Sequence, residues 1–177
     1  MHSITINPFL SDVPIFHTIN SWHSPVFDKI MLFLTNSGEW AVVWVFIACI
    51  LFLLNRKRGH EIVFNTLLAV IFSSFLNDLL LKTVFYRERP YLALQDVHHL
   101  GTSWHNSSFV SGHTASSFAA ALVLSSFFPK FSALFIALAL GIAYSRIYVG
   151  MHYPSDIIGG VIIGIISAYL VYKLRKK

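Results

Sequence analysis

Long apolar stretches separated by short polar connections dominate the sequence. Five of them cover residues 39–55, 60–84, 111–128, 131–150 and 155–173, and each is long enough to cross a bilayer as a helix. The sequence lacks the alternation of polar and apolar residues that marks strands, and no internal repeat or Pro-rich linker divides it. The pattern therefore predicts an all-α integral membrane bundle that forms a single domain over residues 1–177.

A sixth stretch, residues 13–35, is less apolar than the others. Prolines and polar or charged residues interrupt it: Pro14, His17, Asn20, His23, Pro25, Asp28 and Lys29. Residues 1–38 therefore contain either a first span or a helix that lies in the membrane interface. We favour the span, which gives six transmembrane helices, with five as the alternative. The first fifteen residues contain no Lys or Arg and are broken by Pro8, so we expect no cleavable signal there.

The distribution of Lys and Arg predicts the orientation of the helices. The turns at residues 55–59 and 129–130 are short, so neighbouring helices are expected to be antiparallel. Most basic residues then fall on one side, which the positive-inside rule assigns to the cytoplasm together with the C-terminus: Arg56, Lys57, Arg58, Lys130, Lys173, Arg175, Lys176 and Lys177. Five basic residues lie on the opposite, outer side: Lys29, Lys82, Arg87, Arg89 and Arg146. Except for Lys29, they stand at span ends or in the long loop 86–110, and they need an explanation other than topology.

The composition supports a membrane protein and excludes several other classes. Hydrophobic residues make up 55% of the chain and charged residues 12%, and the mean hydropathy is +0.65. The net charge of +5 does not indicate nucleic-acid binding, because the basic residues form no long patch interleaved with aromatic residues. Cys49 is the only cysteine, which excludes a disulfide or a thiolate metal site within the chain. We expect no cofactor and no obligate protein partner.

Three polar clusters carry the candidate chemistry, all at helix ends on the outer side. Lys82 and Arg89-Pro90 follow the third span, and Ser111-Gly112-His113 opens the fourth. Ser145-Arg146, His152 and Asp156 join the fifth span to the sixth. Because these helix ends share one face, we predict that residues 82–113 and 145–156 form the two segments of one active site.

The basic residues of these clusters suggest an anionic ligand. Lys82, Arg89 and Arg146 would repel one another in a small space unless an anion neutralised them, and a phosphate would do so. The planar fork of Arg pairs with two phosphate oxygens, whereas Lys acts as a point charge. The alternative is that Lys82 and Arg89 reach lipid head groups, with Asp78 pairing to Lys82 one turn away.

The remaining cluster residues suggest proton transfer and nucleophilic attack. Ser111 and Gly112 would start a helix whose free N–H groups attract an anion, and His113 beside it could protonate a leaving oxygen. His152 and Asp156 are four residues apart around Pro154, so the carboxylate could orient the imidazole for attack. Taken singly, Ser111 could be a simple helix cap, and Asp156 could merely complement the helix dipole.

These residues resemble the signature of the type 2 phosphatidic acid phosphatase superfamily, which includes bacterial acid phosphatases and vanadium haloperoxidases. The signature reads K-x6-R-P, P-S-G-H and S-R-x5-H-x3-D, and here it covers Lys82 to Pro90, Val110 to His113 and Ser145 to Asp156. One position departs from it, because Val110 stands where the family usually has proline. Every catalytic position of the signature is present.

The resemblance implies a metal-independent phosphoryl transfer in two steps. His152 would attack phosphorus, Asp156 would orient it, and His113 would protonate the departing oxygen, after which water would hydrolyse the phosphohistidine. The oxygens of the phosphoryl group would be held by Lys82, Arg89, Arg146, Ser111 and Gly112. Similar bacterial members act on undecaprenyl diphosphate, phosphatidylglycerophosphate, phosphatidate or the 1-phosphate of lipid A. We therefore expect a lipid phosphate in the outer leaflet as substrate, and a site facing the periplasm or exterior of a bacterial plasma membrane.

Other functions remain open from the sequence. The loop residues Asp96, His98, His99 and His105 could form a metal site for a metal-dependent membrane hydrolase, although their spacing fits no strong ligand pattern. A non-enzymatic lipid-binding or transport protein could use the cations only to grip head groups. A small soluble phosphate is a further possible substrate. Intramembrane proteolysis fits least, because Ser111 and Ser145 lack a G-x-S-x-G context.

Overall fold

The computed structural model describes residues 4–5, 9 and 11–176, and the described chain is almost entirely helical. The expectation about a leader in the first fifteen residues lies partly outside these residues. Among the described residues, the one addition to the predicted all-α fold is a short parallel pair, β1 (Ile4–Thr5) with β2 (Phe85–Tyr86). The helices, in chain order, are α1 (Asp12–Asn20), α2 (Pro25–Gly38), η1 (Glu39–Ala41), α3 (Val42–Leu54), α4 (Gly59–Ser74), η2 (Phe75–Leu81), α5 (Lys82–Val84), α6 (Pro90–Ala93), α7 (Gly112–Phe127), η3 (Pro129–Phe131), α8 (Ser132–Tyr148) and α9 (Pro154–Arg175).

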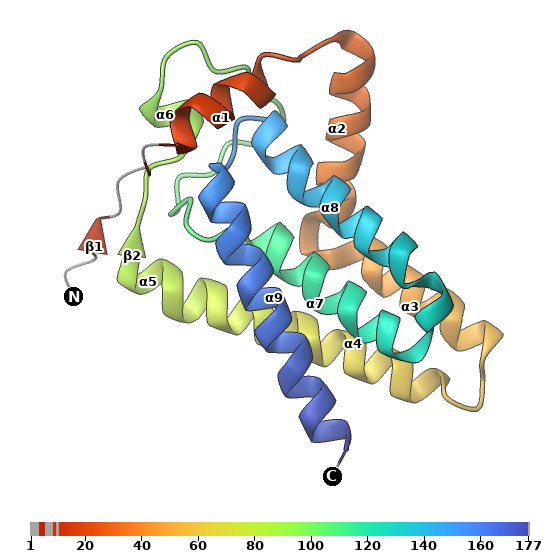
Figure 1. The fold of residues 1–177 in the computed structure, drawn as a ribbon. Helices are drawn as coiled ribbons and strands as arrows, with labels where there is room; N and C mark the ends of the chain where they lie inside the picture. The colour runs from red at the N-terminus through yellow and green to blue at the C-terminus, as the bar shows by residue number, and fades with distance from the viewer. Residues whose placement is uncertain (1–3, 6–8, 10, 177) are drawn as a thin grey trace.

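Helix α7 forms the centre of the bundle, and α4, α8 and α9 pack around it (Figure 1). Small residues allow this close packing: an added Cβ on Gly164 of α9 would lie 2.6 Å from the Cβ of Phe118 and 2.8 Å from the carbonyl oxygen of Ala115. Trp44 of α3 is fully buried and donates a hydrogen bond of 2.9 Å from Nε1 to Ser117 Oγ of α7. The packing therefore encloses α7 and sets the position of its first turn.

Within the part of the chain that the structure describes, three helical segments are long and apolar enough to cross a membrane. They are Gly59–Val84, which joins α4, the π-helical η2 and α5, then Pro129–Tyr148 and Pro154–Arg175. A fourth candidate is the pair α2 and α3, which passes only as one broken span with a bend of 68°. Helix α7 has 16 residues and crosses the protein interior rather than facing lipid along its whole length.

The favoured single span over residues 13–35 does not form. The chain instead makes α1, turns at Ser21–Ser24, and starts α2 at Pro25, where Ser24 Oγ accepts a hydrogen bond of 3.3 Å from the N–H of Phe27. Helix α1 lies beside the start of α9, because the N–H of Ser155 donates to Asp12 Oδ1 at 3.0 Å. The polar residues in this stretch thus cap and anchor two short helices, and they do not interrupt a single long helix.

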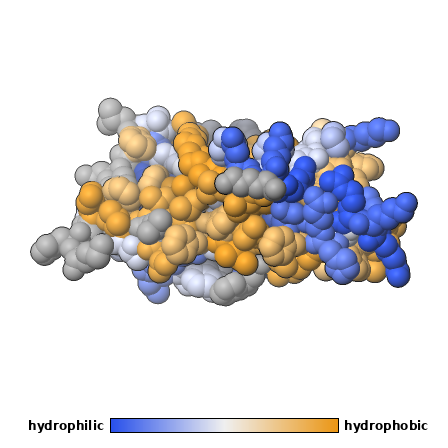
Figure 2. Space-filling model, turned by 90° about the horizontal axis from the view of Figure 1, so that it is seen from below, coloured by the Kyte–Doolittle hydropathy of each residue, from blue (hydrophilic) through white to orange (hydrophobic). Residues whose placement is uncertain are grey.

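As predicted, the basic turn between α3 and α4 and the basic end of α9 lie at the same end of the bundle. Arg58 contacts Glu61 at 3.2 Å, and Arg175 donates to Ser126 Oγ at 3.1 Å. The guanidinium groups of Arg58 and Arg175 both lie over the ring of Phe127, 5.0 and 4.5 Å from its centroid. Figure 2 shows hydrophilic surface gathered towards the right of a largely apolar face, the side on which the α3–α4 turn lies in Figure 1.

Candidate active site

The polar clusters predicted from the sequence meet at the end of the bundle where α7 and α9 begin and α5 and α8 end. The N–H of Ser111 donates to the carbonyl oxygen of Asp156 at 3.1 Å, which joins the first turn of α7 to that of α9. The N–H groups of Met151 and His152 both donate to the carbonyl oxygen of Arg146, at 3.1 and 3.2 Å, which folds the α8–α9 turn back on α8. The widely separated segments 82–113 and 145–156 are thus brought together.

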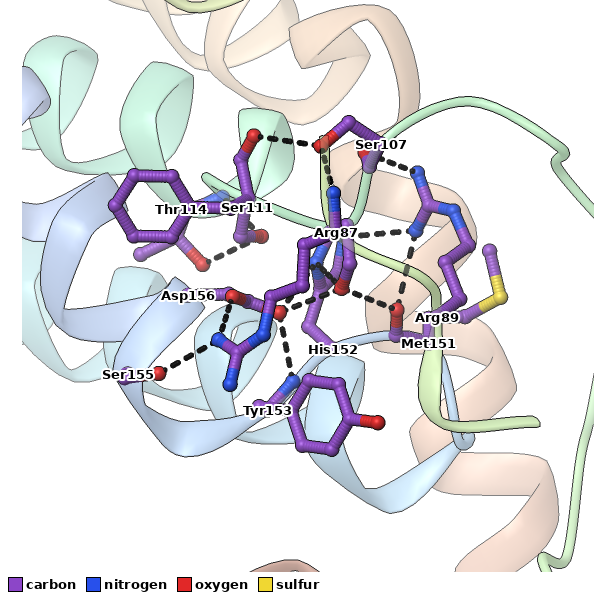
Figure 3. Close-up of polar contacts among 12 residues, drawn as sticks. Arg87, Arg89, Ser107, Ser111, Thr114, Met151, His152, Tyr153, Ser155 and Asp156 are labelled. Atoms are coloured by element: carbon purple, nitrogen blue, oxygen red, sulfur yellow. Dashed lines mark hydrogen bonds and ion pairs between the residues drawn. The ribbon is translucent and has the colours of Figure 1, made fainter. Parts of the chain in front are cut away.

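The imidazole of His152 is held between a guanidinium group and a hydroxyl group (Figure 3). Its Nε2 lies 3.2 Å from Nη1 of Arg89, and its Nδ1 lies 3.4 Å from Oγ of Ser108. The carboxylate of Asp156 is 3.6 Å from the same Nδ1, slightly beyond hydrogen-bonding distance. Ser108 stands between them and donates to Asp156 Oδ2 at 2.5 Å, so a hydroxyl group bridges the expected histidine–aspartate pair.

Asp156 is fully buried, and each of its oxygens is bound from a different direction. Oδ2 accepts hydrogen bonds from Ser108 and from the N–H of Tyr153, the latter at 2.9 Å, and so faces His152. Oδ1 accepts a 2.5 Å hydrogen bond from Nη1 of Arg87. The carboxylate therefore has little freedom to rotate.

Arg89 is buried and its fork is held by backbone and amide oxygens. It donates to the carbonyl oxygen of Met151 at 3.1 Å, to the carbonyl oxygen of Asn106 at 3.1 Å and to Oδ1 of Asn106 at 2.6 Å. Burial lowers the pKa of Arg89 from its ordinary value, whereas Tyr91 and Asp156 act to raise it. The group is thus a fixed donor aimed at the space beside Nε2 of His152.

The first turn of α7 lies at the site, but one of the N–H groups expected to be free, that of Ser111, donates to Asp156. Ser111 caps the helix, since its Oγ accepts hydrogen bonds from the N–H and hydroxyl groups of Thr114 at 3.4 and 3.0 Å. A Cβ added to Gly112 would lie 2.8 Å from Asn77 Nδ2 and 3.9 Å from Lys82 Nζ. Glycine therefore lets the side chains of Asn77 and Lys82 lie close to the start of α7. Lys82 also makes the alternative contact considered above, 2.8 Å from Asp78 Oδ1.

His113 and Arg146 line a small cavity on the α2 side of the site, together with Met151, Thr35, Asn36, Glu39, Leu100, Gly101, Thr102 and Trp104. Arg146 is buried, and its Nη1 donates a hydrogen bond to Thr35 Oγ1. Its Nε has no hydrogen-bond partner among the described residues. The cavity thus combines a histidine with a cation that retains an unused donor, which suits a phosphoryl oxygen.

Several positive charges act on His152 at once. Burial lowers the pKa of His152 well below its ordinary value, and the charges of Arg89, Arg146 and Lys82 lower it further. The imidazole is therefore neutral at neutral pH and keeps a lone pair for attack on phosphorus.

Sequence reasoning missed part of the polar network. Ser108 and Asn106 lie in the long loop, where no spacing pattern singled them out. Arg87 stands out in the sequence only because its position opposes the positive-inside rule, and no pattern marks Asp12 as a partner of the site. Val110, which replaces the family proline, is buried against α9, and Cγ1 of Val110 would lie 2.4 Å from a Cβ on Gly159. The loop still delivers Ser111 to its capping position.

Two histidines of the long loop 86–110, His98 and His99, have separate partners. His98 stacks on His23 and lies 3.4 Å from Asp28 Oδ2, whereas His99 stacks on Tyr91. Burial lowers the pKa of His99, the Val149 carbonyl raises it, and the charges of Arg146 and Arg89 lower it. Among the residues that the structure describes, no three His, Cys, Asp or Glu side chains are grouped to hold a metal ion.

Comparison with known proteins extends the resemblance noted in the sequence motifs to most of the chain. Residues 62–177 match the family model of the PAP2 superfamily. A lipid A 4'-phosphatase of Porphyromonas gingivalis is 32% identical over 90% of this chain and 71% of its own length. The undecaprenyl-diphosphatase BcrC of Bacillus subtilis is 29% identical over 86% of this chain and 77% of its own length. The crystal structure of Aquifex aeolicus LpxE superposes with a TM-score of 0.83 and 33% identity, covering 96% of this chain and 99% of that chain.

Proposed function

The chain belongs to the PAP2 superfamily and is a phosphatase of the membrane, and from this premise we propose that it hydrolyses a lipid phosphate through a phosphohistidine intermediate. The observation that carries the proposal is the buried imidazole of His152, fixed between Arg89 and the Ser108–Asp156 pair. Such an arrangement provides a nucleophile next to a ready-made phosphate site.

The proposed reaction assigns one role to each group. Nδ1 of His152 carries its proton towards Ser108 and Asp156, so the lone pair of Nε2 attacks phosphorus while the bond to the lipid oxygen breaks. His113 gives its proton to that oxygen. Water then attacks the phosphohistidine, His113 takes a proton from the water, and the P–N bond breaks to release inorganic phosphate.

The cations take up the charge of the phosphoryl oxygens during both steps. Arg89 leaves Nε2 of His152 and turns its Nη1 proton to a phosphoryl oxygen, and Lys82 exchanges Asp78 for the phosphate. Arg146 offers its unpartnered Nε. The N–H of Gly112 at the start of α7 completes the site, because the N–H of Ser111 is already used by the carbonyl oxygen of Asp156.

We propose a substrate with a long lipid tail, because the site lies at the ends of apolar helices. Lipid A phosphates and undecaprenyl diphosphate lead the candidates, since relatives over most of this chain bear those activities in their names. Phosphatidylglycerophosphate and phosphatidate follow. The loop around Trp104 borders the cavity of His113 and would contact the head group.

We further propose five membrane crossings and a site on the periplasmic or outer face of a bacterial plasma membrane. Helix α1 touches the site, whereas the end of α3 lies with the basic turns at the other end. The chain between them crosses an odd number of times, so α2 and α3 together form the first span. The basic turns and the C-terminus then face the cytoplasm.

The direct test is phosphate release by the purified protein in detergent. The panel contains lipid A, undecaprenyl diphosphate, phosphatidylglycerophosphate, phosphatidate and p-nitrophenyl phosphate, each with and without EDTA. We expect release from one lipid class, insensitive to EDTA and inhibited by vanadate, and near-complete loss in His152→Ala. The matched control is His60→Ala, because His60 lies at the opposite end of the bundle and packs on Phe52.

A labelled substrate tests the intermediate. Rapid quenching at high pH should trap a phosphoryl group on His152, stable to alkali and labile to acid, in the wild-type protein but not in His152→Ala. Lipid binding without phosphate release by folded protein would favour a binding or transport role instead. Release abolished by EDTA would favour a metal-dependent reaction.

A further inference from the structure

Buried ion pairs connect Asp12 of α1 to Asp156 through Arg87. Figure 3 shows the part of this network that joins Arg87 to Ser155 and Asp156. Nη2 of Arg87 donates to Asp12 Oδ2 and Nη1 donates to Asp156 Oδ1, both at 2.5 Å. Ser155 strengthens the link, since its hydroxyl group donates to Asp12 Oδ2 at 2.6 Å and accepts from Arg87 Nη1 at 2.7 Å. One guanidinium group therefore joins two carboxylates from helices far apart in the sequence.

All three charged residues of this network are buried. The exposed fractions are 2% for Asp12, 1% for Arg87 and 0% for Asp156. The guanidinium group also lies over the ring of Tyr153, 4.1 Å from its centroid. Burial acts to raise the pKa of Asp12, but hydrogen bonds from Ser155 and Arg87 outweigh it and hold the pKa below its ordinary value. Asp12 is thus a charged group, committed to Arg87.

The geometry relates Asp12 to the orientation of Asp156. Arg87 binds only Oδ1 of Asp156, which leaves Oδ2 for Ser108 and the side facing His152. Asp12 holds the other end of the fork and keeps Arg87 from turning both nitrogens towards Asp156. Without the charge of Asp12, the guanidinium group would centre on its remaining carboxylate and draw Oδ2 away from Ser108 and His152.

We propose that Asp12 is a positioning residue of the reaction, acting through Arg87 on Asp156 and so on the nucleophile His152. Helix α1 is then part of the catalytic apparatus, although it precedes the segment that matches the family model, residues 62–177. This inference rests on the proposed function, because it takes His152 as the nucleophile and Asp156 as its support.

Steady-state kinetics on Asp12→Asn and Arg87→Lys test the proposal. Asn keeps the size of Asp12 but removes its charge, and one ammonium group cannot span both carboxylates. We expect kcat per folded molecule to fall about 10- to 100-fold in each variant, with KM within about twofold of wild type. The matched control is Asp28→Asn, since Asp28 anchors the same N-terminal region by accepting 2.7 Å from Tyr148 Oη and does not contact Arg87. This control should keep the wild-type kcat.

A double-mutant cycle separates positioning from mere anchoring. If Asp12 acts through Asp156, Asp12→Asn should cause little further loss in the Asp156→Asn background, whereas independent effects would multiply. Unchanged kcat in folded Asp12→Asn, or an equal loss in Asp28→Asn, would overturn the proposal. If Asp12→Asn does not fold, Ser155→Ala provides the test, because it removes the hydrogen bonds of Ser155 to Asp12 and Arg87 without removing a charge. A several-fold loss of kcat in Ser155→Ala supports the proposal. An unchanged kcat overturns it.

The two proposals fail in different ways. Phosphate release that survives His152→Ala, or no release by the wild-type protein, would overturn the proposed function and this inference with it. Release that depends on His152 but is indifferent to Asp12 and Arg87 would overturn the inference alone.

Discussion

The charges of three cations act on the imidazole of His152 at the end of the bundle where α7 and α9 begin, and they determine its protonation state. In free solution a histidine is half protonated near pH 6.5. Here burial and the charges of Arg89, Arg146 and Lys82 favour the neutral form. A bound phosphate would cancel part of that positive charge. In the proposed reaction the cations would therefore first keep His152 unprotonated and then hold the substrate.

The pH dependence of kcat/KM follows from this environment. Because the pKa of His152 in the folded protein is lowered, the active, neutral form persists as the pH falls through 6.5. The acidic limb assigned to the enzyme should therefore lie well below pH 6.5. Lys82→Met removes one positive charge and should move this limb to higher pH. Measuring kcat/KM against pH for the wild type and Lys82→Met on the same substrate removes the contribution of substrate ionisation from the comparison. If the acidic limbs of the two profiles coincide, the limb does not belong to His152.

Arg89 is the cation whose shape matters most. Its fork is held by four oxygen acceptors from Met151, Asn106 and Ser107, which aim Nη1 at the reaction space. Arg89→Lys keeps the charge but loses the fork, so we expect kcat/KM to fall by about 100-fold, or roughly 2.7 kcal/mol. Lys57→Arg, at an exposed position in the opposite turn, should leave kcat/KM unchanged. A small effect of Arg89→Lys would show that charge alone suffices.

At the scale of elements, the site depends on how closely α9 approaches α7. Gly160 and Gly164 of α9 face α7, and an added Cβ on Gly160 would lie 2.7 Å from the carbonyl oxygen of Ser111. Both distances from Gly164, 2.6 and 2.8 Å, are also shorter than atoms tolerate. The Gly-x3-Gly spacing is a common means of close packing between membrane helices. It holds Ser111 and Asp156 in register.

Gly164→Ala should therefore destabilise the protein. Its new Cβ would push α9 away from Phe118 and Ala115, and we expect a loss of about 1–3 kcal/mol, measured as a lower midpoint of thermal unfolding in detergent. Gly141→Ala is the control, because its Cβ would meet Leu34 Cδ1 at 3.6 Å and Cδ2 at 3.9 Å, which are ordinary contacts. Equal midpoints for the two variants would argue against the close α7–α9 packing.

For the whole molecule, the arrangement of the two ends decides the topology. One end of the bundle carries α1, the long loop and the site, and the basic turns lie at the other end. An apolar surface joins the two ends, as expected for a protein that spans a bilayer (Figure 2). The broken pair α2–α3 is consistent with one crossing rather than two.

Cysteine labelling in intact cells tests this topology. In a Cys49→Ala background, Thr18→Cys of α1 and Lys130→Cys of the α7–α8 turn place exposed thiols at the two ends. A maleimide that cannot cross the membrane should label Thr18→Cys and not Lys130→Cys. The six-span arrangement would instead put α1 on the cytoplasmic side, and labelling of neither position before the cells are opened would support it.

The sequence by itself determined the fold class, the grouping of basic turns at one end, and the candidate chemistry of the site. Apolar run length is a direct response to bilayer thickness, so residues 60–84, 131–150 and 155–173 could be recognised without a structure. Lys82, Arg89, Arg146 and the two histidines could be recognised because charged and titratable groups at the ends of apolar helices need a reason to be there.

Only the tertiary structure decided how residues 13–35 fold and which side chains support His152. Local pattern could not show that Asp12 meets Ser155, since contacts over such a separation depend on how the helices pack. It also could not place Ser108 between His152 and Asp156, because a loop residue carries no periodic signal. Hydrophobic periodicity reflects which face of each segment contacts lipid or the protein core. The orientation of a buried carboxylate instead depends on the hydrogen-bond partners that the whole fold places around it.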